Sequence, residues 1–207
     1  MNISLDNLTV NFDDRFQLDE LNWQLNDSQH WVVTGANGSG KSALAAVLAS
    51  AGENLSGSIE GLPAKVGLVS FEAQAELIEA ELKKDDADIM DVIAEGTPVH
   101  EILNPGDSNQ TLIDELVEKF ALQPLVDRAF RKLSTGESRK VMLIRALASE
   151  PDLLILDEPF DGLDVHTLEM LQAYLASLVE TVPMVMVLNR FDEFPDFITH
   201  IAYVDHG

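Results

Sequence analysis

The chain has 207 residues, a length that suits one domain or one domain with an inserted lobe. Its 36 acidic and 13 basic side chains give a formal charge of -23, which repels nucleic-acid backbones and anionic lipid headgroups, so we expect no nucleic-acid partner. Cysteine is absent, which excludes disulfides and thiolate metal sites, and without an apolar membrane-spanning run or a signal peptide the expected location is the cytoplasm.

Strand patterns alternate with helical patterns along the chain. Apolar residues alternate over residues 3–10 and 21–25, which predicts two exposed-edge strands of antiparallel character. Residues 30–34 form a short apolar run before a glycine-rich turn, and the Ala- and Leu-rich residues after the turn favour a helix. Buried strands that alternate with helices imply an α/β fold with a mostly parallel sheet covered on both faces, after an antiparallel N-terminal part. Further strands are predicted at residues 66–71, 153–156, 184–188 and 201–204.

Residues 73–150 differ from the rest of the chain because helical periodicity dominates them. We therefore expect a helical lobe inserted into an α/β core made of residues 1–72 and 151–207. Charge is uneven within the lobe. Acids gather between residues 72 and 101, which is typical of a solvated helix face. Cations dominate the following stretch: Arg128, Arg131, Lys132, Arg139, Lys140 and Arg145.

The segment GANGSGKS at residues 35–42 matches the phosphate-binding pattern G-x-x-x-x-G-K-[ST] and lies between a predicted strand and a predicted helix. In such a loop glycines let successive backbone N–H groups turn toward an anion, and the helix N-terminus adds partial positive charge. Lys41 would reach the β- and γ-phosphates and the Ser42 hydroxyl would bind Mg²⁺. A glycine-rich turn with a chance lysine is the alternative, which the context on both sides disfavours. The expected ligand is a nucleoside triphosphate with Mg²⁺, held by Gly35, Asn37, Gly38, Ser39, Gly40, Lys41 and Ser42.

Two acids, Asp157 and Glu158, follow the buried run LLIL at residues 153–156. Open α/β sheets bind ligands at the carboxyl edge, and we expect the strand with these acids to neighbour the strand before the phosphate loop. Asp157 would hold Mg²⁺ directly or through water, and Glu158 would polarise the attacking water as general base. Two acids that merely end a strand before Pro159 are the alternative, which is weaker beside a phosphate loop.

The order of these motifs, with LSTGE at residues 133–137 between them, resembles the ABC-type ATP-binding cassettes across nearly the whole chain. Ser134, Thr135 and Gly136 match the signature motif of that family, in which Thr135 and Glu137 replace a Gly and a Gln. The resemblance implies that two cassettes sandwich ATP head to tail, so the signature of one closes over phosphates bound by the other. The neighbouring cations suit that contact, and they balance the acids of the lobe equally well.

The same resemblance assigns roles to other positions. Phe12 matches the aromatic residue that stacks on adenine in the family, although a lone Phe suits a core position equally. Residues 161–164 correspond to the D-loop and depart from it at the first two positions. Asn189 occupies the place of a histidine that contacts the γ-phosphate, and an amide hydrogen-bonds phosphate but carries no proton. The glutamine that senses Mg²⁺ and the helical lobe corresponds to Gln74, with Glu72 as a substitute.

The phrases LSTGESRK, LLILDEPFDGLD and LNRFDE are similar to the first cassette of the ModF-type molybdenum-transport ATP-binding proteins, which carry two cassettes in tandem. Since Gly207 directly follows a strand, we expect a second cassette after it. The implied function is an ATPase that binds and hydrolyses Mg-ATP with a second cassette and is coupled, through a membrane permease, to transport at the inner face of the membrane. Its catalytic residues would be Glu158, Asn189 and Gln74.

Two other functions stay open. The cassette could be an ATP-gated switch that hydrolyses slowly because Asn189 replaces the histidine, since loss of one transition-state contact costs on the order of 10²–10³ in rate. A ribosome-associated cassette would also lack membrane spans, but the charge of -23 and the lack of a basic arm argue against it.

Overall fold

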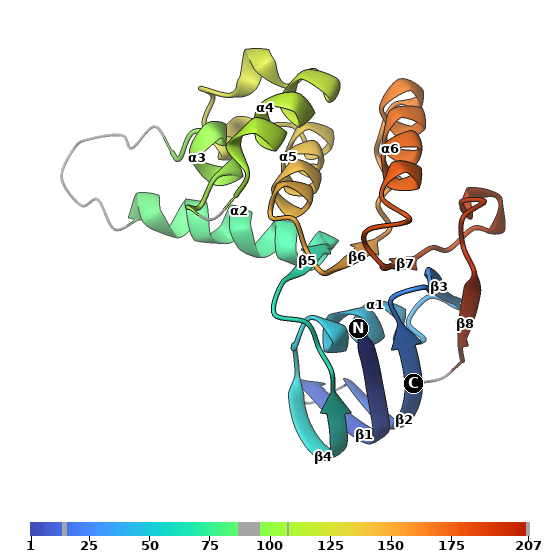
Figure 1. Ribbon diagram of the computed structural model, residues 1–207. Coiled ribbons are helices and arrows are strands. Elements are labelled where there is room, and N and C mark those ends of the chain that lie inside the picture. The colour runs from blue at the N-terminus through green and yellow to red at the C-terminus, as the bar shows by residue number, and fades with distance from the viewer. Residues whose placement is uncertain (14–15, 87–95, 107, 206–207) are drawn as a thin grey trace. The chain divides into compact units, whose positions relative to one another are not determined.

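The computed structural model describes all residues except 14–15, 87–95, 107 and 206–207 (Figure 1). The chain forms two compact units. The core unit comprises Met1–Leu68, Asp152–Pro159 and Gln172–Gly207, and the helical unit comprises Val69–Pro151 and Phe160–Leu171. The helical unit thus includes residues 73–150 and takes in a second segment, Phe160–Leu171, beyond the acid pair.

A three-stranded antiparallel sheet opens the core unit, with β1 (Asn2–Asp13) between β2 (Phe16–Asn26) and β4 (Glu53–Glu60). The first two strands confirm the predicted alternation and are longer than predicted. Their register shifts between Leu5 and Leu8, and the inward-facing pattern therefore slips by one residue at that bulge. The strand β4 was not predicted, because its sequence ENLSGSIE is polar and nearly all exposed, so cross-strand pairing with β1 rather than burial specifies it.

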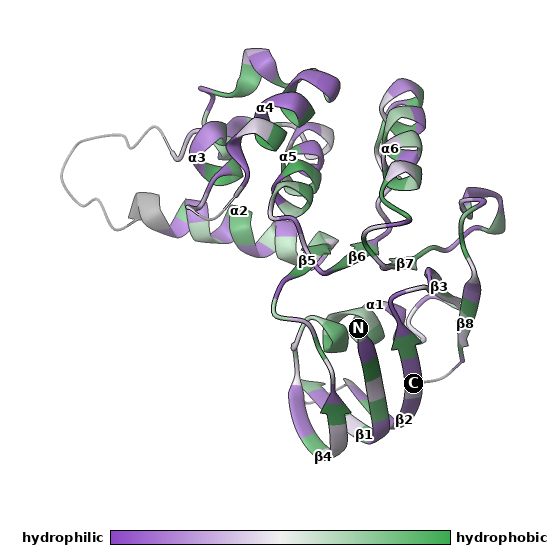
Figure 2. Ribbon diagram, in the orientation of Figure 1, coloured by the Kyte–Doolittle hydropathy of each residue, from purple (hydrophilic) through white to green (hydrophobic). Residues whose placement is uncertain are grey.

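A second sheet of five strands has the order β5-β6-β7-β3-β8, and the registers recorded for β3, β6, β7 and β8 are parallel. This confirms the predicted α/β class with a parallel sheet and an antiparallel part. The apolar runs of β6 and β7 are buried throughout, and Figure 2 shows β7 in the hydrophobic colour. These strands are β5 (Val66–Val69), β6 (Leu153–Asp157), β7 (Met184–Val187), β3 (Trp31–Gly35) and β8 (His200–Val204).

The strand order corrects one expectation. The strand with the acid pair, β6, does not neighbour the strand before the phosphate loop, β3, because β7 lies between them. Sequence order alone places β6 before β7 without saying which of the two pairs with β3. The carboxyl ends of parallel strands lie at the same edge of a sheet. The residues that follow β7 therefore lie at the edge that also holds the phosphate loop and the acid pair.

The helix α1 (Lys41–Leu48) is anchored in the core unit by its apolar side. Leu44, Val47 and Leu48 belong to the same buried cluster as Leu5 of the antiparallel sheet and Ile155 of the parallel sheet. Contact with both sheets fixes the position of the helix and of the loop that precedes it.

The helical unit contains α2 (Phe71–Asp86), α3 (Val99–Leu103), α4 (Gln110–Lys119), α5 (Thr135–Ala148) and the first half of α6 (Val165–Ser177), with short 3₁₀ turns η1 (Gln123–Leu125) and η2 (Phe130–Lys132). A further turn, η3 (Phe191–Glu193), belongs to the core unit. In the described part of the chain, no helix combines the length and apolar character needed to cross a membrane. Large side chains with almost no exposure form the core of the helical unit: Leu103, Leu116, Phe120, Phe130, Leu143 and Ile144.

A buried histidine precedes β3. His30 is 3% exposed, its Nε2 lies 3.1 Å from the carbonyl oxygen of Val179, and its ring meets that of Phe197 edge to face. Because a carbonyl only accepts, Nε2 donates, and no hydrogen-bond partner is found among the described residues for the buried Nδ1. Burial, which penalises the charged imidazolium, lowers the pKa of His30 below the usual 6.5.

This burial predicts a pH-dependent stability. Below about pH 6.5 the unfolded chain binds a proton at His30 that the folded chain resists, so the free energy of unfolding falls as pH falls. The variant His30→Gln, which keeps a donor for Val179, is expected to show a shallower decline between pH 7 and pH 5. Urea unfolding at several pH values measures it, with the exposed His100→Gln as control. Identical slopes for His30→Gln and the unaltered protein would contradict the assignment.

Candidate functional site

The phosphate loop runs from the end of β3 to the start of α1, as the sequence predicts. Gly38 and Gly40 adopt left-handed backbone angles, with φ of 79° and 103°, which side chains other than glycine adopt at a cost. Gly35 has a different reason to be glycine, because a Cβ there would lie 2.1 Å from the carbonyl oxygen of Val204 on β8. The loop is closed by a hydrogen bond of 3.1 Å from the Ser39 N–H to the Ala36 carbonyl.

The first turn of α1 leaves its N–H groups available. The first helical hydrogen bond runs from the Leu44 N–H to the Gly40 carbonyl, at 2.8 Å. Among the described residues no side chain caps this helix, and the N–H groups of Lys41, Ser42 and Ala43 have no acceptor. The buried Ser39 hydroxyl likewise has no hydrogen-bond partner in the described structure. Unpaired N–H groups at a helix start suit an anion with several oxygens, such as a phosphate chain.

Lys41 lies inside the loop rather than on the surface. It is 6% exposed, and its ammonium donates to the carbonyl oxygens of Gly35 and Ala36 at 3.0 and 2.8 Å. Two neutral carbonyls leave its positive charge uncompensated, and a bound phosphate would supply the compensating anion. The loop therefore fits the predicted phosphate ligand, and the Lys41 ammonium lies within it.

The acid pair lies at the same edge of the parallel sheet. Asp157, 5% exposed, ends β6 opposite Val187 of β7, and the Glu158 N–H donates to the Val187 carbonyl at 3.0 Å. Glu158 has φ of 47°, a left-handed angle that is costly for a residue with a side chain and that turns the chain sharply out of the sheet. A serine hydroxyl and a carboxylate are hard oxygen ligands, so the residue type of Ser42 and that of Asp157 each suit Mg²⁺.

Asn189 follows β7 and meets the acid pair directly. Its Nδ2 donates a hydrogen bond to Glu158 Oε1. The next residue, Arg190, forms ion pairs with Asp192 and Glu193, which lie in the same short segment. The sequence indicated Glu158 and Asn189 separately, whereas their contact follows from the position of β7 beside β6.

Phe12 lies in β1 and is packed, partly buried, against the core cluster. Its Cε1 would lie 3.2 Å from a Cβ on Gly52, so the ring fills the space above that glycine. The expected stacking of Phe12 on adenine stays a prediction.

The signature residues open α5 in the helical unit. Ser134 caps the helix: its hydroxyl accepts from the Glu137 N–H at 3.3 Å, and Glu137 Oε2 accepts from the Ser134 N–H at 2.7 Å. This reciprocal capping box uses either Glu or Gln at the third helical position, which explains why Glu137 is compatible with the motif. The hydrogen bond from Ser134 lowers the pKa of Glu137, so this carboxylate stays ionised.

The D-loop segment packs beside the signature within the same unit. A Cβ on Gly136 would lie 3.3 Å from the Gly162 carbonyl. Asp164 caps α6 by accepting from the N–H and hydroxyl of Thr167, at 2.9 and 2.7 Å, and it pairs with Lys140 of α5 at 3.4 Å. These bonds, chiefly that from the Thr167 hydroxyl, hold the pKa of Asp164 well below its usual range.

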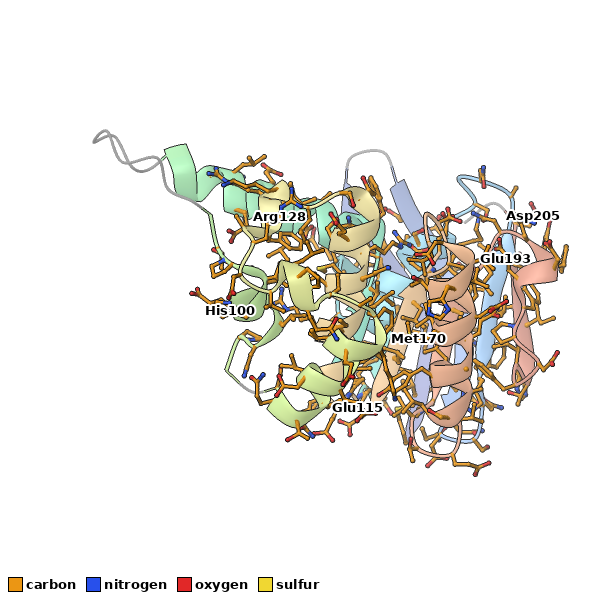
Figure 3. The ribbon with its side chains drawn as sticks, turned by 90° about the horizontal axis from the view of Figure 1, so that it is seen from above. His100, Glu115, Arg128, Met170, Glu193 and Asp205 are labelled. Carbon is orange, nitrogen blue, oxygen red and sulfur yellow. The ribbon has the colours of Figure 1, made fainter. Side chains whose placement is uncertain are left out.

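The basic residues near the signature differ in their exposure to solvent. Arg139 is buried and Lys140 pairs with Asp164, whereas Arg128 and Lys132 are exposed. Figure 3 labels Arg128 together with His100 of α3 and Glu115 of α4 on the helical unit. At least one of the cations thus belongs to the internal structure of this unit.

Gln74 does not face solvent. It is 3% exposed on α2, and its Nε2 donates to the Ser138 hydroxyl of α5 at 2.7 Å. The alternative residue, Glu72, is exposed in the first turn of α2. Ser138 was not among the residues that the sequence indicated, because nothing in the motif pattern links positions 64 residues apart.

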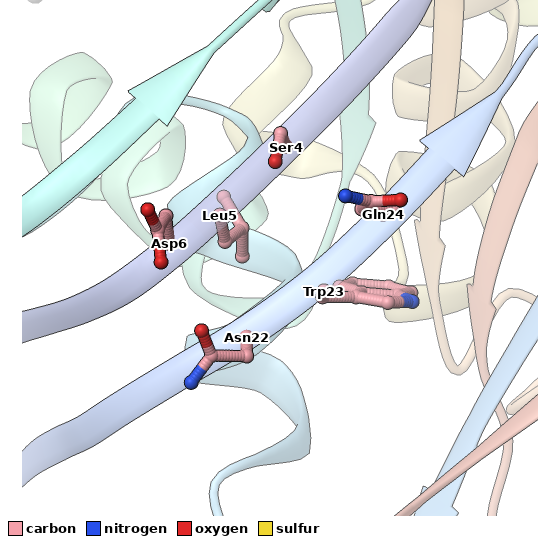
Figure 4. A pocket seen from close by; sticks show the side chains of 6 residues that line it. All are labelled: Ser4, Leu5, Asp6, Asn22, Trp23 and Gln24. Atoms are coloured by element: carbon pink, nitrogen blue, oxygen red, sulfur yellow. The ribbon is translucent and has the colours of Figure 1, made fainter.

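A depression of about 460 Å³ lies on the antiparallel sheet (Figure 4). Asn22 accepts from the Asn7 N–H at 3.1 Å and donates to the Glu20 carbonyl at 2.8 Å, and Asp6 accepts from the Asn7 amide at 3.2 Å. These polar groups stabilise the bulge of β1, so we assign no ligand to the depression. It is lined by Ser4, Leu5, Asp6, Asn22, Trp23 and Gln24.

The fold and the loop geometry define an α/β P-loop NTPase. Residues 18–161 match the family model described as ABC transporter, and the chain belongs to that family, as an ATP-binding cassette. Cassettes of this family are generally ATPases that bind ATP, typically with Mg²⁺.

Similar proteins agree with that assignment. The chain is 42% identical over 177 residues to the ABC transporter ATP-binding protein ModF of Escherichia coli, covering 84% of this chain and 36% of ModF. It is 32% identical over 201 residues to the zinc import ATP-binding protein ZnuC of Vibrio parahaemolyticus, covering 96% and 67%. A solved ATP-binding subunit of an ABC transporter shares the fold, with a TM-score of 0.79 and 17% identity over 100% of this chain and 87% of that one.

The close approach at Gly35 predicts a steep cost for a side chain. Gly35→Ala places a methyl group against the backbone of β8, which cannot yield like a flexible side chain, so we expect the free energy of unfolding to fall by about 2–4 kcal/mol. Gly38→Ala is the matched control: its Cβ meets nothing within 4 Å, and only the backbone cost of about 1 kcal/mol remains. Urea unfolding compares the two variants, and equal losses would refute the contact.

Proposed function

We propose that this cassette binds Mg-ATP at residues 35–42 and hydrolyses it in a head-to-tail pair with a second cassette, and that hydrolysis drives transport. The observation that carries the proposal is the start of α1, where N–H groups without an acceptor occur in the same loop as the buried ammonium of Lys41. Such a start favours a multiply charged anion because the helix dipole and the lysine add to each other.

The site residues of the core unit have different roles in this proposal. The loop N–H groups and Lys41 bind and orient the phosphate chain, and Ser42 and Asp157 hold the metal. When bound there, Mg²⁺ would neutralise the charge that develops on the phosphate oxygens. Glu158, projecting beyond the strand end, accepts a proton from the attacking water, and Asn189 holds its carboxylate through Oε1.

The second cassette supplies the signature, and it is either a tandem half or a second copy of the chain. Ser134, Thr135 and Gly136 of one cassette would close over the phosphates bound by the other. Since the chain spans 36% of the length of ModF, the activity of the whole protein is part of the proposal. A membrane permease is the proposed partner for transport.

The proposal does not specify which substrate is transported. The resemblance of the sequence motifs to ModF-type cassettes favours a molybdenum-related role, whereas the 32% identity to a zinc import protein favours no particular cargo. A cassette contacts nucleotide and partner surfaces, so the permease would determine the substrate.

Removing the Lys41 ammonium tests the binding site. We expect Lys41→Ala to weaken Mg-ATP binding by about 10- to 100-fold, the usual worth of a buried charge-assisted contact. Calorimetric titration measures the affinity. The control is Lys65→Ala, which removes the same charge from an exposed position. Equal affinities for the Lys41 variant and the control would reject the proposal.

A second candidate function, a switch that hydrolyses slowly, is favoured by one observation. Asn189 bonds to the general base and carries no proton, so it cannot supply the positive charge of a histidine to the transition state. In this case ATP binding would drive association of the cassettes, and turnover would occur mainly at the other site.

Restoring the histidine distinguishes the two candidates. If the site is slow, Asn189→His is expected to raise the single-turnover hydrolysis rate by about 10- to 100-fold, the scale of one transition-state contact. The same change in a Glu158→Gln background serves as control, because there the general base is absent. A rate unchanged by Asn189→His would count against the slow switch and favour an active ATPase with an asparagine in this role.

A further inference from the structure

Gln74 and the signature helix are joined by a buried chain of hydrogen bonds in the helical unit. Gln74 Nε2 donates to Ser138 Oγ at 2.7 Å, and Ser138 Oγ lies 3.0 Å from the carbonyl oxygens of both Ser134 and Thr135. A hydroxyl has one proton and two lone pairs, so Ser138 donates to this carbonyl pair and accepts from Gln74. The three groups therefore form a directional chain from α2 to the first turn of α5.

Burial strengthens this series of hydrogen bonds and leaves its groups few other partners. Gln74 and Ser138 are each 3% exposed, so water cannot replace either partner. Hydrogen bonds in a low-dielectric interior are strengthened, and they polarise one another when they are connected in series. A buried amide that lost Ser138 would be left with an unsatisfied donor.

The position of Gln74 on its helix is fixed independently. Ser70, directly after β5, caps α2: its hydroxyl accepts from the Ala73 N–H at 3.0 Å, and its carbonyl accepts from the Gln74 N–H at 3.2 Å. The backbone of Gln74 is therefore held at the start of α2, while its side chain reaches α5. The start of one helix determines where the first turn of the other can lie.

We infer that Gln74 is a positioning residue for the signature, which it holds through Ser138, and that it is not a ligand of the metal. The inference presupposes the proposed function only in that the first turn of α5 must meet a nucleotide to be useful. The Gln74 side chain is 3% exposed and its amide nitrogen is bonded to Ser138 of α5, which is the arrangement that a positioning residue requires. The capping box of Ser134 and Glu137 shapes the same turn from within α5, and Gln74 adds a restraint from another helix.

A double-mutant cycle tests the restraint in the 207-residue chain. The variants are Gln74→Met, which keeps the length of the side chain but removes the donor, Ser138→Ala, and the two together. Matched controls are Gln123→Met, at an exposed position of the same unit, and Ser149→Ala, whose hydroxyl bonds only to Ala146 among the described residues. The first readout is hydrogen exchange of the Glu137 and Ser138 amides, which bond to Ser134.

Each single variant is expected to speed hydrogen exchange at these two amides about tenfold. The double variant is expected to add less than about twofold, because both changes break the same series of hydrogen bonds. Neither control should change it. Exchange that is unaltered in Gln74→Met, or effects of the two changes that simply multiply, would overturn the inference. If Gln74→Met does not fold, Ser138→Ala alone still tests whether the chain restrains the first turn of α5.

The second readout separates positioning from metal binding. The Mg²⁺ concentration that half-saturates ATP binding is expected to change by less than about twofold in Gln74→Met and in Ser138→Ala. A rise of about tenfold in Gln74→Met with no change in Ser138→Ala would identify Gln74 as a metal ligand and overturn the inference. If the unaltered chain binds no ATP, the proposed function fails, and the exchange experiment still decides the role of Gln74.

Discussion

The candidate site of the core unit depends on one electrostatic feature, the unpaired start of α1. A helix start without a cap is unfavourable unless something else satisfies its N–H groups. In this chain glycines at 38 and 40 produce the turn, no described side chain caps the helix, and two neutral carbonyls hold the Lys41 ammonium in the loop. The apolar residues of α1, packed with both sheets, stabilise a conformation that the loop alone would not favour.

The start of α1 differs from the capped starts of α2, α5 and α6. The start of α5 is closed by the capping box, and the start of α6 is closed by Asp164. The start of α1 is left open to the ligand. A capped start with ionised Glu137 offers phosphate fewer free N–H groups than α1 does. In the proposed function, the helix that would bind phosphate and the helix that would cover it thus satisfy their N–H groups in opposite ways.

The motifs and most buried strands could be predicted because they depend on local spacing. The phosphate loop needs glycines, a lysine and a hydroxyl within eight residues, and apolar runs such as LLIL and MVMV have no stable place except a buried strand. The polar strand β4 could not be predicted in this way, because its pairing with β1 specifies it rather than its own composition. The register shift near Asn7 coincides with a break in the alternation, because the apolar residues Leu5 and Leu8 are three positions apart.

The sequence by itself determined the class of fold, the phosphate loop and the identities of the acids and of Asn189, because each of these is encoded by residues adjacent in the chain. Only the tertiary structure decided that β7 lies between β3 and β6, that Asn189 therefore meets Glu158, and that Gln74 is enclosed with Ser138. Those relations join residues 31 and 64 positions apart. Spacing along the chain carries no information about contacts at such separations, which arise when packing of buried strands and helices selects one arrangement.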